Sequence, residues 1–420
     1  MSDADRYQFL PGGTGPTIVG GDGCWLLAED GRRILDAAGG AMVGNVGYGR
    51  REVADAVHAA MTGGGYVIPL WPTPTRLALR DELVEHWLPD GMGNVFFTSG
   101  GSESADSALR LAVAYQAAKG RSQRWKVVGR HPSYHGITVG ALAAGSHDRR
   151  RAGYEPLLVE HPKVPWDDAE AALKVIERED PDTIAAFFFE PITGASGACL
   201  EPGAAYWQAI EDVCRRHDIL LVADEVMTGF GRTGRRWGHD HLPVRPDVLY
   251  GGKGLGGGYV AIGMVAATDT VVETLRASAF MYFTFTGNDA ACAGALAVLR
   301  ILRNERLVER SATMGDVLAA RLADALGDHA HVGDLRGRGL FRGIELVADR
   351  ATGTPFPARA GVTAAVVREC LARDVWVYPA GSGPVRDAIM LGPPLVIEDS
   401  ELELAVDTVT GAITAVTSTI

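Results

Sequence analysis

The chain has 420 residues, of which 47% are hydrophobic and 22% charged, and its formal net charge is -12 with an isoelectric point near 5.4. The composition is ordinary for a globular protein, and the acidic balance argues against nucleic acid or an anionic membrane surface as the main partner. The longest apolar runs, such as 184–189, have the length of a strand and fall far short of the ~20 residues that a membrane span requires.

The N-terminal stretch MSDADRYQFLPGG is acidic and has no apolar core, so we expect no secretory signal. Five cysteines without C-x-x-C spacing indicate reduced thiols, and we expect a cytoplasmic protein. The H-x-H pairs His239/His241 and His329/His331 could bind metal, but no neighbouring thiol or acid completes either set. We therefore expect no metal site.

Short apolar strands alternate with helical stretches through the middle of the chain. The expected elements are a helix over 102–118 and strands over 94–98, 126–128, 184–189, 219–223 and 248–250. Continuous apolar strands separated by helices predict an α/β fold with a parallel sheet covered on both faces. Ligands of such sheets bind beyond the carboxyl ends of the strands. Functional residues should therefore stand directly after each strand.

The C-terminal part has a different pattern, which predicts a smaller α+β domain. Residues 288–326 are rich in helical periodicity and precede expected strands near 340–346, 376–378 and 389–391. The chain closes with a helix that we expect to open on a capping box of Ser400 and Glu403.

Two strand ends allow both a functional and a structural interpretation. Gly101 and Ser102 follow the strand 94–98 and open a helix, which either binds an anion at its N-terminus or is an ordinary helix capped by Ser102. Asp224 follows the strand 219–223 and is either a functional carboxylate, a helix cap or half of a structural ion pair.

The other strand ends carry an aromatic and an imidazole, Tyr134 and His135, a second acid, Glu190, and a lysine, Lys253. Lys253 lies within PDVLYGGKGLGGGYVAIG, among seven glycines. A flexible loop is one interpretation. A Walker-type phosphate loop is excluded because Gly254 stands where Ser or Thr should hold magnesium. A third interpretation makes Lys253 a nucleophile, with glycines leaving room for a bulky group on its nitrogen.

One cofactor needs nearly this set of groups. Pyridoxal phosphate requires an anion site for its phosphate, a carboxylate that keeps its pyridine nitrogen protonated, an aromatic side chain over its ring and a lysine for its aldehyde. The five strand ends together predict a site for it.

The motifs FFTSGGSES, PSYHG, FFFEPITGASG, LVADEVMTGFGRTG, GGKGLGGGY and FTFTGND, in this order and spacing, resemble the class III aminotransferases, pyridoxal-phosphate enzymes of fold type I. The resemblance covers roughly 20–394. It implies a large domain over 61–300, with a mostly parallel sheet of seven-stranded type between helices. It also implies a small α+β domain from the two chain ends, with 1–60 joining 301–420.

Carried over by position, the resemblance makes Lys253 the Schiff-base lysine and Asp224 the partner of the pyridinium nitrogen. The remaining implied cofactor contacts are the phosphate loop (Gly101, Ser102), the residues on the two ring faces (Tyr134, Val226) and two residues that border the ring (His135, and Glu190 near the 3-hydroxyl).

Thr284 resembles the threonine that reaches the phosphate from the neighbouring subunit, which implies a homodimer, possibly a tetramer, with sites at the interface. Arg232 also fits the family pattern, and we interpret it as structural.

The stretch NVGYGR at 45–50 resembles the amine–pyruvate, or ω-aminotransferase, branch. Met42 stands where that branch often has an aromatic residue, which suggests a roomier substrate pocket. Trp71 is a further candidate for substrate contact. Arg386 lies near the position of the arginine that holds the acceptor carboxylate in that branch, but in another register; it is either that arginine or a surface residue.

The resemblance implies a transaminase that moves an amino group from an amine or ω-amino acid to a 2-oxo acid such as pyruvate. The reaction would be ping-pong and proceed through a Lys253 aldimine. The same fold also carries racemases or epimerases, aminomutases, decarboxylases and lyases, so these remain open, as does a non-catalytic sensor.

Overall fold

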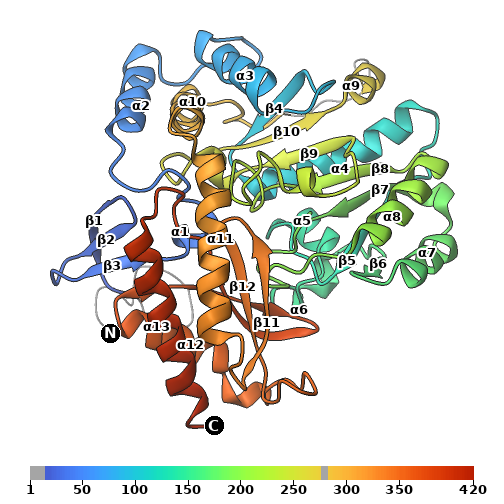
Figure 1. Ribbon diagram of the computed structural model, residues 1–420. Coiled ribbons are helices and arrows are strands. Elements are labelled where there is room, and N and C mark those ends of the chain that lie inside the picture. Colours follow the sequence, from blue (N-terminus) through green and yellow to red (C-terminus); the bar gives the residue numbers. More distant parts are fainter. Residues whose placement is uncertain (1–14, 276–281) are drawn as a thin grey trace.

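The computed structural model describes residues 15–275 and 282–420 (Figure 1). Its larger part is built around a seven-stranded sheet with the strand order β4-β10-β9-β8-β7-β5-β6. The strands are β4 (Asn94–Thr98), β5 (Lys126–His131), β6 (Lys163–Pro165), β7 (Ile184–Phe189), β8 (Leu220–Asp224), β9 (Val248–Gly251) and β10 (Gly263–Ala267). Strand β10 is antiparallel to both of its neighbours, and the pairs among β9, β8, β7, β5 and β6 are parallel.

Helices cover both faces of this sheet. Along β7, Phe187 and Phe189 belong to one apolar cluster together with Trp207 of α8, whereas Phe188 belongs to a second cluster together with Leu111 of α4. Because successive side chains of a strand point to opposite faces, one strand supplies both layers of the core. The predicted α/β fold with a mostly parallel sheet is confirmed.

The helices that surround the sheet begin in several cases at a side-chain cap. Thr73 caps α3 by accepting a hydrogen bond from the Arg76 N–H, and Asp168 caps α7 in the same way. The helices of this part are α3 (Pro74–His86), α4 (Gly101–Ala118), α5 (Val139–Ala144), α6 (Asp148–Arg151), α7 (Ala169–Arg178), α8 (Ala204–His217), α9 (Asp269–Leu275) and α10 (Asp289–Asn304).

Of the seven strands of the large sheet, the sequence predicted five and missed two. The bounds of β4 and β7 are those expected, and β8 starts one residue later than expected and includes Asp224. Strands β6 and β10 were not predicted. β6 has only three residues, and β10 reads GMVAA, in which small residues and a glycine give little strand signal.

The second part of the molecule joins the two ends of the chain. Strand β3 pairs in parallel with β13, although the paired residues Leu35 and Val375 are 340 positions apart in sequence. Strand β13 thereby extends the sheet of β1, β2 and β3. Another sheet has the order β11-β12-β15-β14. The elements are β1 (Ile18–Asp22), β2 (Trp25–Ala28), β3 (Arg33–Asp36), α1 (Gly39–Met42), α11 (Leu307–Leu326), β11 (Val332–Arg338), β12 (Phe341–Leu346), α12 (Val362–Ala372), β13 (Val375–Trp376), β14 (Tyr378–Ser382), β15 (Val385–Leu391) and α13 (Asp399–Thr417). Helix α2 (Arg51–Gly63) lies instead beside α10 in the larger part (Figure 1). The domain limits predicted from sequence stay a prediction.

The predicted capping box of the last helix is wrong by two residues. Glu398, not Ser400, is the extended residue that precedes α13, and its side chain accepts a hydrogen bond from the backbone of the first turn. In return, the Glu398 N–H donates to the Glu401 carboxylate at 2.8 Å. Ser400 lies inside the first turn, so glutamate takes the capping position that the sequence suggested for serine.

The histidine pairs and cysteines lie in structural surroundings. His239 bonds to Glu225 and His241 to Thr233, and the five cysteines are free and buried. Within 15–275 and 282–420, no group of three or more His, Cys, Asp or Glu could hold a metal ion. Over the same residues, no helix combines the length and apolar character needed to cross a membrane. The stretch MSDADRYQFLPGG lies outside the described residues.

Candidate functional site

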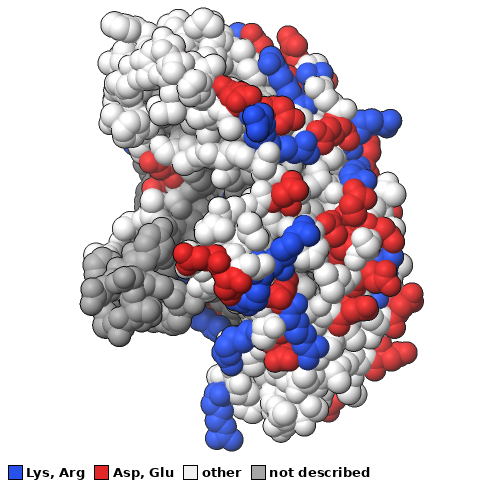
Figure 2. Space-filling view, turned by 90° about the vertical axis from the view of Figure 1, so that its left-hand side faces the viewer, with Lys and Arg blue, Asp and Glu red and all other residues white. Residues whose placement is uncertain are grey.

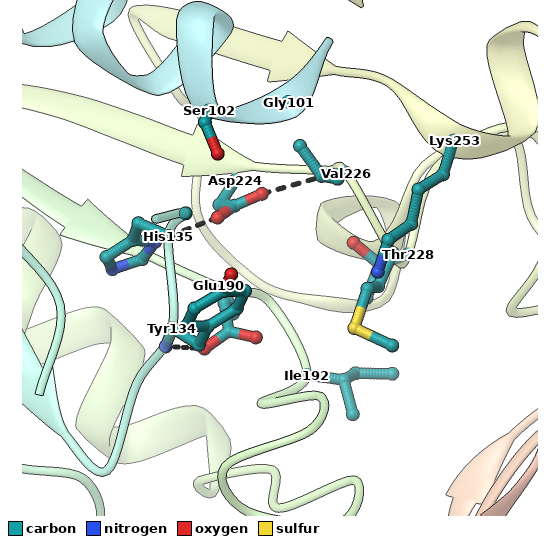
Figure 3. Close-up of a pocket in the computed structure, with 12 residues that line it drawn as sticks. Gly101, Ser102, Tyr134, His135, Glu190, Ile192, Asp224, Val226, Thr228 and Lys253 are labelled. Atoms are coloured by element: carbon teal, nitrogen blue, oxygen red, sulfur yellow. Dashed lines mark hydrogen bonds and ion pairs between the residues drawn. The ribbon is translucent and has the colours of Figure 1, made fainter. Parts of the chain in front are cut away.

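A cavity of about 170 Å³ opens at the carboxyl edge of the seven-stranded sheet (Figure 3). Eight residues singled out from the sequence line it: Gly101, Ser102, Tyr134, His135, Glu190, Asp224, Val226 and Lys253. Four further lining residues were not predicted: Gly136, Ile192, Met227 and Thr228. In Figure 3, Lys253 enters from the side opposite to His135 and Tyr134, with Asp224 between them. Strand ends that are far apart in sequence therefore meet at one cavity.

Asp224 is the last residue of β8 and is held by its neighbours. The Val226 N–H donates to Oδ1 at 3.0 Å, and His135 Nδ1 lies 2.8 Å from Oδ2. A carboxylate only accepts hydrogen bonds, so His135 carries its proton on Nδ1. With 5% of its surface exposed, Asp224 presents a fixed negative charge to the cavity. It caps no helix, and its partner His135 also lines the cavity.

Tyr250 is a residue of this site that the sequence did not reveal. Its hydroxyl lies 3.1 Å from the same His135 nitrogen that bonds to Asp224. Burial and the neighbouring Asp224 raise the pKa of Tyr250 well above its ordinary value, so its hydroxyl keeps its proton. Tyr250, His135 and Asp224 form one buried network behind the cavity.

Lys253 starts the short helix η5 (Lys253–Leu255) directly after β9. Its backbone has φ +43°, in the left-handed region that non-glycine residues seldom adopt. Strained backbone of this kind is common at functional sites. Burial lowers the pKa of the Lys253 ammonium from 10.5 to about 8, although Asp224 and Glu190 act in the opposite direction. A substantial fraction of Lys253 is therefore the free amine near neutral pH.

Three glycines around Lys253 have a packing role, and the interpretation that glycines leave room for a group on its nitrogen stays a prediction. A Cβ on Gly254 would lie 2.5 Å from Asn45 Nδ2, and Gly257 and Gly258 have φ values of +58° and +86°. These glycines allow close packing and a tight turn behind the lysine. The interpretation that they leave room for a group on the lysine nitrogen is not needed to explain them.

The anion interpretation of the Gly101–Ser102 segment gains support from its geometry. Gly100 precedes α4, and no side chain caps the helix, so Ser102 is not its N-cap. A helix of 18 residues thus presents N-terminal N–H groups without a side-chain acceptor beside the cavity. A Cβ on Gly101 would lie 2.9 Å from Val226 Cγ1, so only glycine allows this approach without a shift.

Glu190 fixes the loop that carries Tyr134. The Tyr134 and Gly194 N–H groups donate to the two carboxylate oxygens of Glu190 at 2.9 and 2.8 Å. Burial raises the pKa of the Glu190 carboxyl. The Tyr134 ring lies beside the cavity in Figure 3, where it can cover a planar ligand.

Four candidate residues do not line the cavity of this chain. Thr284 and Trp71 are exposed, the latter at 67%. Met42 is buried in an apolar cluster with Ile192 and Met227, both of which line the cavity. Arg386 is exposed and donates through Nη1 to the Phe356 carbonyl at 3.4 Å, which gives no support to a carboxylate role. Arg232, buried completely, bonds to the Leu340 and Pro393 carbonyls as a structural residue does.

The residues present fit pyridoxal phosphate. The uncapped helix end suits a phosphate, Asp224 suits a protonated ring nitrogen, and the Lys253 amine suits an aldehyde.

The lowered pKa of Lys253 predicts how the protein takes up this cofactor. Only the free amine attacks an aldehyde, so the rate of cofactor attachment to the cofactor-free protein should rise with pH. We expect the inflection near pH 8, not near 10.5, because folding shifts the lysine toward the free amine. The growth of the visible absorbance of the attached cofactor, followed from pH 6 to 11 in steps of about one unit, gives this profile. An inflection near 10.5 would show that Lys253 behaves as an ordinary lysine.

Comparison with known proteins gives the same picture over nearly the whole chain. The family model described as Aminotransferase class-III matches residues 14–413. A hypotaurine/taurine–pyruvate aminotransferase from Paracoccus denitrificans is 33% identical, over 99% of this chain and 94% of the relative.

Solved structures agree with the sequence comparison. An (S)-enantioselective omega-transaminase from Thermomicrobium roseum superposes with a TM-score of 0.90 at 34% identity, over 96% of this chain and 93% of that one. The omega transaminase from Pseudomonas jessenii in complex with PMP gives 0.92 at 27% identity, over 100% and 99%. The fold predicted from the sequence motifs is confirmed.

Proposed function

This chain belongs to the class III aminotransferase family, and on that premise we propose that it moves an amino group from an amine or ω-amino acid to a 2-oxo acid such as pyruvate, in a ping-pong reaction with pyridoxal phosphate. The observation that carries the proposal is the meeting of Lys253, Asp224 and an uncapped helix N-terminus at one cavity. These are the three groups that the cofactor requires.

Bound pyridoxal phosphate supplies an aldehyde for the amine and a conjugated ring that accepts the electron pair left when the substrate Cα loses its proton. Gly101 and Ser102 would hold the phosphate at the start of α4. Asp224 would hold a proton on the ring nitrogen, with His135 fixing the carboxylate. Tyr134 and Val226 would enclose the ring from its two faces.

Lys253 has the properties of the group that moves the proton. Its amine would take the proton from the substrate Cα and return it at the cofactor C4′, two bonds away across the substrate nitrogen. A pKa of about 8 suits both directions of transfer near neutral pH, because an efficient acid–base group titrates close to the working pH. The fixed position of Lys253 on a strained, glycine-flanked turn keeps the amine in reach.

The proposed substrate range follows from the relatives and from the wall of the cavity. The Paracoccus relative carries pyruvate in its name, and the Thermomicrobium structure is described as an omega-transaminase. Met227 lines the cavity, and Met42 lies behind it in the same apolar cluster. Flexible thioether side chains adapt to different ligand shapes. We extend the amine–pyruvate assignment to this chain on these grounds.

A donor and acceptor panel tests the proposed function. The purified protein loaded with pyridoxal phosphate should convert pyruvate to alanine with at least one primary amine or ω-amino acid, and 2-oxoglutarate tests the alternative acceptor. Parallel double-reciprocal plots would support the ping-pong order. Loss of CO2 or racemisation of the donor without alanine formation would assign another reaction to the same site.

We also propose that the protein works as a homodimer. Between Asp55 and Arg76 the sequence has no Lys, Arg, Asp or Glu, and the upper left part of the face in Figure 2 is almost free of charged side chains. The exposed apolar side chains of this region are Tyr66, Leu70, Trp71 and, from a distant segment, Phe285. The Tyr66 and Phe285 rings are 6.0 Å apart, so the two segments form one apolar surface next to Thr284. Contiguous apolar surface of this kind marks an interface.

Mixing two inactive variants tests whether Thr284 serves the partner's site. We expect Lys253→Ala and Thr284→Trp to be inactive alone, and to regain activity when the subunits are exchanged. In a hybrid dimer one site lacks both residues and the other has both, so random exchange should restore about one quarter of the sites. If Thr284 acted within its own chain, no hybrid would hold an intact site. Full activity of a monomer in analytical ultracentrifugation would contradict the dimer.

A further inference from the structure

The acceptor of the proposed reaction brings a carboxylate to a cavity that already holds the acids Asp224 and Glu190. A cation is needed to make its binding favourable, and arginine is the side chain that binds carboxylates in a bidentate manner. Arg130 and Arg232, both wholly buried near the site, donate to backbone oxygens of the protein. Arg386 is exposed and bonds to the Phe356 carbonyl. None of these three guanidinium groups lies free beside the cavity.

Arg150 of α6 does. Its guanidinium carbon lies 4.3 Å from the centre of the Tyr134 ring, and its Nη1 donates to the Tyr134 hydroxyl at 3.0 Å. That bond is the one hydrogen bond of the guanidinium within 15–275 and 282–420, so several of its five N–H groups remain available. Its side chain is partly exposed, and Tyr134, on which it rests, lines the cavity.

The neighbours of Arg150 show that this placement is specific. Three consecutive arginines occupy 149–151. Arg151 donates to the carbonyls of Leu142, Ala143 and Gly145 and thereby holds the end of α5. Arg149 is exposed and makes no hydrogen bond to the described part of the chain. The middle arginine of the three is the one directed to the site.

Two further observations concern the electrostatic effect of Arg150 on the site and the packing of its helix. Burial lowers the pKa of Lys253, and the charge of Arg150 acts in the same direction; burial raises the pKa of Tyr134, and the charge of Arg150 opposes that effect. The Asp148 N–H at the start of α6 donates to Ser382 Oγ at 2.9 Å. Helix α6 therefore lies against the turn between β14 and β15, whose other strand carries Arg386. Of the two arginines, Arg150 is the one that contacts Tyr134, whereas Arg386 bonds to the Phe356 carbonyl.

A polar group without a partner lies at the same place. The His147 ring packs edge-on against Tyr134 with ring centres 5.9 Å apart. Its Nδ1 finds no hydrogen-bond partner among the described residues, although the side chain is only 7% exposed. A buried imidazole nitrogen seldom stays without a partner unless a ligand or water supplies one.

We propose that Arg150 binds the carboxylate of the 2-oxo acid acceptor at the Tyr134 edge of the cavity. The proposal rests on the proposed transaminase function and names the residue that recognises the acceptor. With an uncharged amine donor, the guanidinium rests on the Tyr134 ring, where cation–π attraction and one hydrogen bond hold it. With a 2-oxo acid, its free N–H groups bind the carboxylate. One arginine thereby serves two substrates that differ in charge.

Kinetics with charged and uncharged acceptors test this proposal. Arg150→Ala should raise KM for pyruvate about 10- to 100-fold, the scale of a charge-assisted hydrogen bond, and leave the KM for propanal unchanged. Arg150→Lys should restore part of the loss, because it keeps the charge but not the fork. Arg149→Ala removes the same charge one residue away and should match the parent. An equal KM for pyruvate in Arg150→Ala and parent would overturn the proposal, as would an equal loss with propanal.

A binding measurement without turnover separates this proposal from the proposed function. Propanoate carries the carboxylate but cannot accept an amino group, and its binding to the cofactor-loaded protein can be followed through the cofactor absorbance. We expect Arg150→Ala to weaken propanoate about 10- to 100-fold and Arg149→Ala to leave it unchanged. Equal affinities in Arg150→Ala and parent would overturn the anion site even in an active transaminase. A parent protein that binds propanoate through Arg150 but transaminates no acceptor would instead contradict the proposed function alone.

Discussion

Replacement of Lys253 by alanine should abolish transamination and leave the fold intact. Alanine at φ +43° is as strained as lysine, so the backbone cost does not change. The lost side chain extends into the cavity, so little packing is removed (Figure 3). Loss of the proton-transferring amine alone should lower kcat by about 10²–10⁴-fold, and loss of the attachment point adds to this. Turnover with pyruvate, together with the melting temperature, measures both expectations.

A second buried lysine makes a sharp control for this prediction. Burial lowers the pKa of Lys163 to about 7, below that of Lys253, but its Nζ donates to the Ala143 and His161 carbonyls, away from the cavity lining. Borohydride reduction of the loaded protein followed by peptide mapping should label Lys253 and not Lys163. Label on Lys163 would show that a low pKa, and not a position in the cavity, determines which lysine carries the cofactor.

The sequence was sufficient to predict the sheet and most of the cavity because both depend on the strand ends. β7 is IAAFFF, apolar on both faces, and such a run has few alternatives to a central strand. The polar residues Tyr134, Glu190 and Asp224 follow strands, and parallel strands bring their carboxyl ends to one edge. The antiparallel strand β10 escaped prediction because pairing across the sheet depends on segments distant in sequence.

Two residues of the site could not be found in this way. Tyr250 lies within a buried strand, where an aromatic residue has the same pattern as a core residue, and only the structure places its hydroxyl next to His135. Arg150 lies in a run of three arginines, a pattern that is typical of solvent-exposed surface. Its difference from Arg149 and Arg151 arises from which side of a four-residue helix faces Tyr134. Neither signal is present in the sequence pattern.

The contribution of a second subunit could not be predicted from a single chain, for a related reason. Thr284 and Trp71 were singled out from the resemblance, and both are exposed here. Their roles depend on a surface formed between two chains. The apolar surface around Tyr66, Leu70 and Phe285 supplies a physical reason for such a contact, and the subunit-exchange experiment decides it.

Replacement of Asp224 by asparagine should lower kcat by at least about 10²–10³-fold, the scale of removing one electrostatic contact from a developing charge. The carboxylate, fixed by His135 Nδ1 and the Val226 N–H, favours a proton on the ring nitrogen of the cofactor. Asparagine has nearly the same shape but no charge, so the ring nitrogen loses its proton and the ring accepts electrons less readily. We expect the cofactor still to bind, because the phosphate site at α4 is unchanged.

The adjacent acid, Glu225, separates this electronic effect from a loss of structure. Glu225 is completely buried, and its oxygens accept from the Gly238 and His239 N–H groups at 2.8 and 2.9 Å and from the Thr228 hydroxyl at 2.5 Å. In Glu225→Gln an N–H donor must face one of these donors, which should destabilise the fold by about 1–3 kcal/mol. In Asp224→Asn the amide N–H can donate to His135 Nδ1 once the ring carries its proton on Nε2, which has no partner among the described residues, whereas the backbone donors to Glu225 cannot change in this way. Asp224→Asn should therefore lose kcat at a nearly unchanged melting temperature, and Glu225→Gln should lose melting temperature and retain most of its kcat at a temperature where it is folded. Near-normal turnover in Asp224→Asn would show that Asp224 only orients His135. Parallel losses of melting temperature and turnover in both variants would show that the Asp224 carboxylate is a structural group like that of Glu225. A carboxylate whose role is to act on the cofactor should affect turnover without lowering the melting temperature.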